Sequence, residues 1–414
     1  MDLDGAVQEV KHGLLDLIGP LIQGRVVVLT GSVVNNDALG DFFAEAGARE
    51  VRRVELYIET ESPTHLRFSG IEALIADPPP SVQHLLDTID PTINAIVYAG
   101  SFTAQSSFCG RKIIGVRQKS HFDAERKDRQ QEYITAPICS KPYTIDLADT
   151  DDASRTVLAW VHRAPTIVSG IPEGYLALGS SHTYLIEKEQ IDHLQAHRLS
   201  NLIQTIARDC RQAVLSTLDR GRPCTYYGYV SRRWIVDFGP FEALVYWNRK
   251  SWQLWAPGIV RPLLLDEAQC GAANGAVHAA ARRLHENTGY TGAFCTDGMM
   301  QSDRYVIHEI NPRVCAGFSL LAELCGGCLP LALIDLALRT RPAEADEVLR
   351  TPLNDLAPML QRQEPVVKLW DAHLSPLQEE LRSRANGMED IAAWLAQVRQ
   401  SLADEDLVSL ADHD

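Results

Sequence analysis

The sequence predicts an α/β fold with a parallel, Rossmann-like sheet first, antiparallel hairpins next and a helical extension at the carboxyl end. Short apolar strands alternate with helices over roughly the first hundred residues, and this alternation favours a parallel sheet. Strands rich in aromatic and β-branched residues, separated by tight turns, fill much of residues 225–311 and favour hairpins. Helical patterns dominate after residue 320.

Length and composition bound the class of protein. A chain of 414 residues, 45% hydrophobic and 22% charged, is ordinary for a soluble globular protein of two or three domains. The net charge of −15 argues against nucleic acid, whose phosphates need a basic face. No apolar run approaches the ~20 residues of a membrane helix, and the acidic amino end is not a signal peptide. Nine cysteines in apolar segments indicate a reducing cytoplasm.

The first segment contains three expected helices and three expected strands. The helices are predicted at residues 14–22, 37–46 and 82–89, and the strands at residues 25–30, 51–58 and 95–100. Gly31-Ser32 and Gly100-Ser101 follow strand carboxyl ends, where parallel sheets bind ligands. Without a GxGxxG fingerprint, dinucleotide binding is not predicted. These loops are either structural or contact a substrate.

The middle of the chain begins with a basic run. Residues 118–132 are expected to form a charged helix, and an exposed helix face explains the cations between Arg111 and Arg129. A strand at residues 165–170, a Gly/Ser-bearing loop and a strand at residues 184–186 follow. Small residues let backbone N–H groups approach oxygens closely. This segment is therefore either a flexible phosphate cover or an ordinary surface hairpin.

Several strands and a long helix lead to the most informative motif. The strands are expected at residues 225–230, 234–238, 243–247 and 252–255, and the helix at residues 272–288 with Gly289 as its stop. Glu242 opens a buried strand after Gly-Pro, and Arg261 follows a Pro-Gly pair. Both are candidate substrate contacts.

Residues 292–320 place a carboxylate, Asp297, before a cluster of polar residues. A turn is expected at Gly298, polar turn formers follow, and residues 305–310 form an apolar strand. Two strands joined by a tight turn would set Asp297 near Glu309. An alternative interpretation is a solvated hairpin face, but an apolar strand that carries charged residues needs a reason, because unpaired buried charge is costly.

Glu309, Asn311 and Arg313 alternate by two, so their side chains are expected on one face. With Asp297 they offer three hard oxygen donors, which suit Mg²⁺ together with water and phosphate oxygens. The neighbouring guanidinium suits a phosphate or a carboxylate.

This motif, followed by a small-residue turn and an apolar helix, resembles the metal-binding end of the ATP-grasp fold. The resemblance implies that Asp297, Glu309 and Asn311 hold Mg²⁺, with Mn²⁺ as an alternative, against the phosphates of ATP. It implies that Arg313 is the catalytic residue facing an acyl phosphate. It also implies a nucleotide contact for Lys127, because Lys127-Asp128 is similar to a Lys-Asp pair of that family.

The resemblance continues into the Gly/Ser loop. The family's small lid domain carries such a loop, which here includes Gly179, Ser180 and Ser181 as expected nucleotide contacts. The family's lysine on the strand before the loop is missing from residues 167–169. Lys141 is the candidate to replace it, with His182 and backbone groups as the other option.

The implied organisation has three parts. Residues 1–108 would form a Rossmann-like pre-ATP-grasp domain, residues 109–336 an ATP-grasp domain with its lid at about 140–215, and residues 337–414 a mostly helical extension. Within the extension, helices are expected at residues 331–339, 343–350 and 377–402 and a strand at residues 366–370. The last helix either caps the fold or joins a homodimer.

The implied function is an ADP-forming ligase that activates a carboxylate, for example of an amino acid, and joins it to an amine. The general shape is similar to the peptide ligases of natural-product pathways, such as the pheganomycin type. Three alternatives remain open: a ligase that charges the thiol of a carrier protein, a nucleotide-binding regulator without catalysis, and a chance motif. The negative net charge speaks against an acidic carrier unless the basic run at residues 111–129 receives it.

Overall fold

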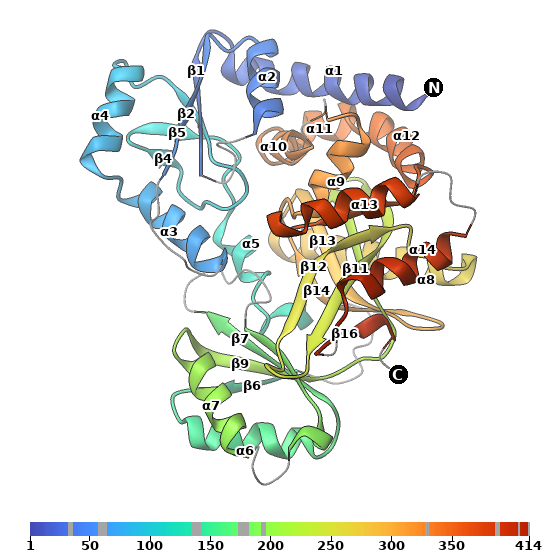
Figure 1. The fold of residues 1–414 in the computed structure, drawn as a ribbon. Coiled ribbons are helices and arrows are strands. Elements are labelled where there is room, and N and C mark those ends of the chain that lie inside the picture. The colour runs from blue at the N-terminus through green and yellow to red at the C-terminus, as the bar shows by residue number, and fades with distance from the viewer. Residues whose placement is uncertain are drawn as a thin grey trace.

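A computed structural model describes most of the chain, and its strands form three sheets (Figure 1). The described residues are 1–31, 36–56, 64–134, 142–172, 182–191, 196–327, 329, 331–385, 390–404 and 406–412. The predicted fold class is confirmed, since a mostly parallel sheet comes first, antiparallel sheets follow, and helices dominate the carboxyl end. Among the helices that the structure describes, none has both the length and the apolar character needed to cross a membrane.

The first sheet is parallel except at one edge. In spatial order its strands are β2 (Glu50–Val54), β1 (Val26–Thr30), β3 (Ile96–Tyr98), β5 (Arg111–Ile113) and β4 (Ser107–Phe108), and only β4 runs antiparallel. The sheet thus extends beyond residue 108, where a domain boundary was expected. Its helices are α1 (Leu3–Ile22), α2 (Asp37–Glu45), α3 (Thr64–Ala76) and α4 (Pro80–Ile89).

The second sheet is small and antiparallel. Its order is β6 (Tyr143–Asp146), β9 (Cys210–Thr217), β7 (Thr166–Pro172) and β8 (Thr183–Ile186). Helices α6 (Thr150–Val161) and α7 (Ala196–Ala207) pack on its outer face, at one end of the molecule (Figure 1). Apolar residues of both helices and of all four strands share one core.

The third sheet is the centre of the molecule. Its order is β14 (Tyr305–Asn311), β13 (Gly292–Met300), β10 (Arg222–Val230), β11 (Ile235–Asn248), β12 (Leu254–Arg261) and β15 (Val366–Leu369), with β16 (Leu407–Ser409) also paired to β11. Helix α8 (Glu267–Thr288) covers one face. It ends at Gly289, whose φ of 70° is the left-handed cap that the sequence predicted.

The carboxyl-terminal part covers the central sheet and reaches the first one. Helices α9 (Gly317–Leu324), α10 (Ala332–Thr340), α11 (Pro342–Val348) and α12 (Arg350–Gln361) share a core with α1 and β1. Helices α13 (Ser375–Ala385) and α14 (Ile391–Leu402) pack on β11, β12 and β15. The last helix therefore serves as a cap on the sheet within one chain.

Four local predictions were wrong. The first helix spans Leu3–Ile22, because Asp2 caps it by accepting a hydrogen bond from the Gly5 amide. The tail expected as one helix over residues 377–402 is divided into α13 and α14. The strands expected at residues 234–238 and 243–247 are one long strand, β11, which passes through Gly239 at a φ of 80°.

The fourth error concerns the charged helix at residues 118–132. Only α5 (Lys119–Asp123) and a 3-10 turn (Gln130–Glu132) form, because side chains here bond to distant backbone. The Gln130 side chain accepts from the Ile310 amide at 2.8 Å and donates to the Ala124 carbonyl at 3.0 Å. The basic run is only partly on the surface, since Arg111 and Arg117 are 0% and 1% exposed, whereas Lys112 and Lys119 are exposed.

Candidate active site

The three predicted metal ligands lie together on the hairpin of β13 and β14. The register of the two antiparallel strands pairs Asp297 with Glu309 and Cys295 with Asn311. The Asn311 side-chain amide donates to the Asp297 carboxylate at 3.1 Å. Asp297 and Asn311 are therefore in direct contact, and Glu309 lies opposite Asp297 on the neighbouring strand.

A β-bulge produces this local arrangement. The pairing shifts between Asp297 and Gly298, so Gly298 lies within the strand, and the turn follows at residues 301–304. A Cβ atom at Gly298 would lie 2.1 Å from the Val306 carbonyl oxygen. Gly298, where a turn was expected, thus lies within the strand, opposite a bulge whose extra residue is His308 of β14. Only glycine fits there, because the neighbouring backbone approaches so closely.

The surroundings of Asp297 favour a nearby positive charge. Burial, together with the Glu309 carboxylate, raises the pKa of Asp297 to about 6. Among the residues that the structure describes, no cluster of three or more His, Cys, Asp or Glu side chains is placed to hold a metal. Two carboxylates and one amide leave other positions to water or phosphate oxygens, as Mg²⁺ prefers. The donor set is therefore suited to Mg²⁺ bound with a nucleotide.

Arg313 follows β14 and is held by a buried carboxylate. Its Nε atom lies 3.1 Å from the Glu125 carboxylate, which is 2% exposed. The same oxygen of Glu125 accepts from Arg117 at 2.9 Å. The Arg313 guanidinium also lies 5.5 Å from the ring centre of Phe102. Although burial alone would lower the pKa of Arg313, Cys315 and Glu125 raise it, so the side chain stays cationic.

A cavity of about 410 Å³ brings these residues together between the second and third sheets. It is lined by Asp297, Glu309, Asn311, Arg313 and Lys127. Its opposite wall contains residues of the second sheet, among them Ile167, Ser169, Thr183, Val214 and Ser216. The five predicted residues come from three separate segments, so only the fold explains their meeting.

Lys127 bridges the two walls. Its Nζ atom donates to the Thr183 hydroxyl on β8 at 3.1 Å. Burial lowers the pKa of Lys127, while Glu309 opposes the shift. A cationic side chain that contacts the second sheet and lines the cavity between the two sheets is suited to bind a phosphate group.

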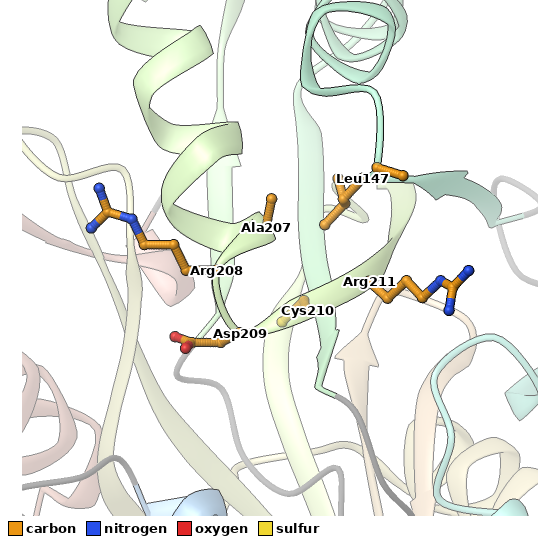
Figure 2. A pocket seen from close by; sticks show the side chains of 7 residues that line it. Leu147, Ala207, Arg208, Asp209, Cys210 and Arg211 are labelled. Atoms are coloured by element: carbon orange, nitrogen blue, oxygen red, sulfur yellow. The ribbon is translucent and has the colours of Figure 1, made fainter.

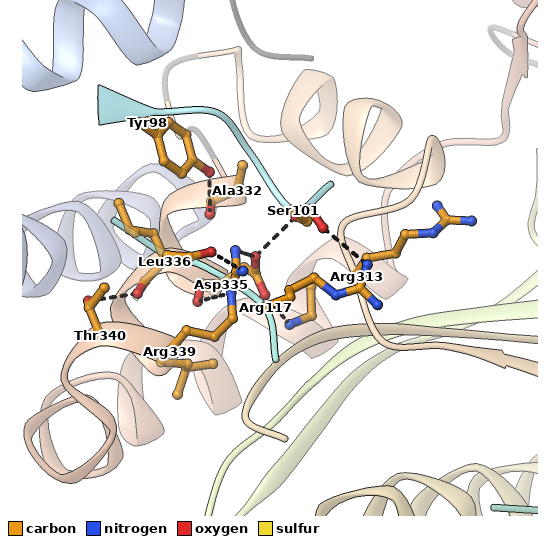
Figure 3. A network of polar contacts seen from close by, with 12 residues as sticks. Tyr98, Ser101, Arg117, Arg313, Ala332, Asp335, Leu336, Arg339 and Thr340 are labelled. Carbon is orange, nitrogen blue, oxygen red and sulfur yellow. Dashed lines mark hydrogen bonds and ion pairs between the residues drawn. The ribbon is translucent and has the colours of Figure 1, made fainter. Parts of the chain in front are cut away.

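A polar network links this site to the first sheet (Figure 3). Arg117 donates to the Ser101 carbonyl at 3.1 Å, and the Ser101 hydroxyl donates to the Asp335 carboxylate at 3.2 Å. Asp335 is fully buried and forms an ion pair with Arg339. The loop after β3, which the sequence left open as structural or substrate-binding, thus takes part in a structural network through Ser101.

The other predicted site residues lie elsewhere. Glu242 is 1% exposed and its carboxylate accepts from the Arg399 guanidinium of α14 at 2.8 Å, so the structure accounts for it as part of an ion pair. Arg261 is 2% exposed and does not line the cavity. The remaining predicted nucleotide contacts lie outside the described residues: Lys141, Gly179, Ser180 and Ser181.

Sequence reasoning missed three side chains of this region. Glu125 and Gln130 were treated as parts of a solvated helix, and nothing in their local pattern marks them as buried. The cavity is also lined by His308, whose Nε2 atom lies 2.7 Å from the Asp219 carboxylate. His308 precedes Glu309 within the motif, so its position was a usable signal.

A second cavity, of about 270 Å³, lies at the end of α7 and the start of β9 (Figure 2). Its lining residues are Leu147, Ala148, Ala207, Arg208, Asp209, Cys210 and Arg211. No residue of the predicted site is among them. Burial raises the pKa of the Cys210 thiol to about 12, so this cysteine is not poised as a nucleophile.

Two antiparallel sheets that enclose a cavity, preceded by a Rossmann-like sheet, give the architecture expected of an ATP-grasp fold. No protein-family model and no curated protein matches this chain.

Three similar solved structures show how distant the likeness is. A biotin carboxylase from Campylobacter jejuni is 14% identical (TM-score 0.45; 78% of this chain and 69% of that chain covered). An L-amino acid ligase from Bacillus licheniformis is 11% identical (TM-score 0.47; 78% and 76%). A D-alanine-D-alanine ligase from Coxiella burnetii is 12% identical (TM-score 0.46; 80% and 97%). At these values the likeness is one of general architecture, and we base the function on the site itself.

Proposed function

We propose that the protein is an ATP-dependent ligase that activates a substrate carboxylate as an acyl phosphate and joins it to an amine, releasing ADP and phosphate. One observation carries this proposal: Asp297, Glu309, Asn311 and Arg313 line one cavity with Lys127, between two sheets. Oxygen donors beside two cations are the groups that phosphoryl transfer requires, because its catalysis depends on positioning and charge neutralisation.

In this proposal each residue has a defined task. Asp297, Glu309 and Asn311 would hold Mg²⁺, which when bound neutralises phosphate charge and aligns the γ-phosphoryl group. Lys127 binds a phosphate oxygen from the opposite side of the cavity. Arg313, fixed by Glu125, stabilises the negative charge of the acyl phosphate.

The bonds balance in two steps. A carboxylate oxygen of the substrate attacks the γ-phosphorus, and the bond to the ADP oxygen breaks. The amine nitrogen then attacks the acyl carbon, the carbon–oxygen bond to phosphate breaks, and the amine loses a proton as the amide forms.

The division of the chain into domains at residues 1–108, 109–336 and 337–414 remains a prediction.

The structure weakens one argument for a carrier-protein thiol as the acceptor. A carrier-protein thiol required a local basic patch over residues 111–129 to receive an acidic carrier. Arg111 is buried against Asp90 at 3.2 Å, and Arg117 against Glu125 at 2.9 Å. Because two cations of this run are neutralised inside the protein, the run offers an acidic carrier less positive charge than its sequence indicates, and we favour a small-molecule amine as acceptor.

Nucleotide turnover tests the proposal. Wild-type protein with Mg²⁺ and ATP is assayed against a panel of amino acids and dipeptides, and ADP, AMP and phosphate are measured separately. We expect ADP and phosphate in equal amounts, only when an acid and an amine are both present. Glu309→Gln should lower kcat at least ~100-fold, which is about 2.7 kcal/mol of transition-state stabilisation.

The matched control is Glu9→Gln, at an exposed position on α1. It removes the same charge far from the cavity and should turn over at the wild-type rate. Release of AMP would contradict the acyl-phosphate route. ATP binding without turnover for any acid would favour the regulator, and no ATP binding at all would refute the proposal.

A further inference from the structure

Arg261, the last residue of β12, is a buried cation for which the described part of the chain supplies no counter-charge. It is 2% exposed, and its Nη1 and Nη2 atoms have no hydrogen-bond partner among the described residues. Its nearest aromatic neighbour is Phe241, whose ring centre lies 5.9 Å from the guanidinium carbon. Burial lowers the pKa of Arg261 to about 10, so the group remains charged at neutral pH.

The other two fully buried arginines of the described chain have carboxylate partners. Arg111 contacts Asp90 and Asp87, and Arg117 contacts Glu125. A buried charge without a partner is strongly unfavourable, so its presence in a folded protein requires a compensating role. A ligand anion would supply the missing counter-charge.

The register of the third sheet places Arg261 in line with the metal set. Glu309 pairs with Asp297, Asp297 with Thr225, and Thr225 with Phe241. Because Glu242 pairs with Val260, the preceding residue Phe241 lies opposite Arg261. Directly opposed residues of neighbouring strands share a face. One row across four strands therefore runs from Asp297 to Arg261 on the face that carries the proposed active site.

The distance along this row is about 14 Å between backbones, since three strand spacings of about 4.8 Å separate β13 from β12. A single carboxylate cannot contact both ends of the row. The surface between them is apolar and aromatic, with Phe241 and Tyr227 packed edge to face at 5.2 Å. The cavity lining reaches Ala243, which is the next residue after Phe241 on the same face of β11, so Phe241 adjoins both the cavity lining and Arg261.

We infer that Arg261 is a subsite for a second carboxylate, one that is not activated, on a small organic substrate of the ligase. This inference rests on the proposed function and names its substrate class. A planar guanidinium binds a carboxylate through two parallel hydrogen bonds. The carboxylate belongs either to an amino acid or peptide that serves as the amine acceptor or to a dicarboxylic acid that serves as the donor.

Ligand-free stability is the first test. Arg261→Met removes the charge and keeps the length of the side chain, and it is compared with Arg399→Met, which leaves the Glu242 carboxylate buried without its partner. In buffer without small carboxylates, Arg261→Met should raise Tm, whereas Arg399→Met should lower it. A fall in Tm for Arg261→Met as large as that for Arg399→Met would argue that Arg261 stabilises the fold by itself.

Carboxylate binding is the second test, and it does not depend on turnover. Tm is measured with Mg²⁺-ATP plus alanine, glutamate or succinate, and with alaninamide as the match for alanine that lacks a carboxylate. The wild-type Tm should rise with at least one free carboxylate and not with the amide, and the rise should disappear in Arg261→Met. Equal shifts in wild type and variant would overturn the subsite.

Turnover then separates the two sources of the carboxylate. If the acceptor carries it, wild type should prefer an acceptor amino acid to its carboxamide, and Arg261→Met should raise the KM of the free acid at least ~30-fold while changing the KM of ATP little. If the donor carries it, the same pattern should appear with a dicarboxylic acid and its monoamide.

The outcomes distinguish this inference from the proposed function. Ligation that depends on Glu309 but shows no loss of carboxylate discrimination in Arg261→Met would refute the subsite alone. If no acid and amine yield ADP, the proposed function fails, and the Tm response to carboxylates decides the subsite by itself.

Discussion

At the scale of single residues, the arrangement around Glu125 shows how one carboxylate organises the site. It lies within 3.1 Å of both Arg117 and Arg313, and its burial leaves it little water. One anion between a buried and a partly buried cation fixes the position of each guanidinium. In the proposed reaction Glu125 is therefore a positioning residue, which acts only through the side chain of Arg313.

Glu125→Gln should reduce activity because it keeps the shape of the side chain but removes the charge that holds Arg313. We expect kcat to fall at least ~10-fold with a smaller change in the KM of ATP. We also expect a lower free energy of unfolding, by about 3–5 kcal/mol, because the buried Arg117 guanidinium and the partly buried Arg313 guanidinium lose their partner. Steady-state ADP release and urea denaturation measure the two effects. A destabilised variant with wild-type kcat would show that Glu125 serves the fold alone.

Single residues also show which parts of the candidate site the sequence predicted and which it did not. The alternation of Glu309, Asn311 and Arg313 and their relation to Asp297 followed from a strand period of two, and the structure places all four on one cavity. Glu125 could not be recognised as a partner of the site, because that role depends on its contact with Arg313, which is far away in sequence. Glu242 shows the converse: a charged residue in an apolar strand signalled burial, but its partner is Arg399 of the last helix.

At the scale of elements, the bulged hairpin of β13 and β14 determines the site. The bulge, whose extra residue is His308 opposite Asp297 and Gly298, allows Asp297 to pair with Glu309 while the remainder of the strand keeps its pairing. The hairpin was predicted from its polar turn residues, but the bulge was not. Its signal was Gly298 itself, because an isolated glycine in a strand pattern indicates either a turn or a close backbone approach.

Gly298→Ala should disrupt the hairpin. A Cβ atom there would lie 2.1 Å from the Val306 carbonyl oxygen and 2.9 Å from the Ile307 Cα, which forces the two strands apart. We expect a loss of several kcal/mol in unfolding free energy, together with weaker Mg²⁺-dependent ATP binding. Urea denaturation and calorimetric titration with Mg²⁺-ATP measure these quantities.

The control is Gly275→Ala in α8, where no atom lies within 4 Å of the added methyl group. Alanine is the better helix former, so this variant should gain about 0.5–1 kcal/mol. If Gly298→Ala is as stable as wild type and binds Mg²⁺-ATP equally well, then the bulge does not determine the geometry of the site.

At the scale of the whole molecule, the first sheet and the central sheet are joined by buried polar groups. Asp335 of α10 accepts from the Ala293 amide of β13 at 2.9 Å and from the Ser101 hydroxyl at 3.2 Å (Figure 3). His121 of α5 lies in the same region, with its ring 4.9 Å from that of Tyr290, after α8. The orientation of the amino-terminal part thus depends on charges that are enclosed only in the complete fold.

This enclosure predicts a pH dependence of stability. Burial, aided by Arg117 and Arg339, lowers the pKa of His121 from 6.5 to about 3. Below pH 6.5 the unfolded chain therefore binds a proton that the folded chain excludes, so stability is present above pH 6.5 and is lost as the pH falls toward 3. At pH 5 the loss from this group is about 2 kcal/mol.

His121→Gln removes the titrating group and should reduce the difference in unfolding free energy between pH 7 and pH 5 by about 2 kcal/mol. Urea denaturation of both proteins at the two pH values measures it. The test compares how much the unfolding free energy of each protein changes between pH 7 and pH 5, and the absolute stability of the variant does not enter it. An unchanged slope would show that other groups carry the acid sensitivity.

The sequence by itself determined the general order of strands and helices and pointed to the residues of the proposed metal site. Strand and helix alternation, the hairpin pattern near residues 225–311 and the motif at residues 292–320 depend on contacts between residues close in the chain. Local periodicity records such contacts directly. The predicted strands at residues 25–30 and 184–186 and the glycine stop of the long helix agree with the structure for this reason.

The tertiary structure alone decided which charges are partners. Glu242 of β11 and Arg399 of α14 meet only after the helix packs on the central sheet, so neither local sequence indicates their pairing. The same holds for Glu125 between two arginines, for the shortened helix α5, and for Arg261, whose missing partner is visible only when its surroundings are known. Burial makes these long-range charges decisive, because a group removed from water must find its partner wherever the fold brings one.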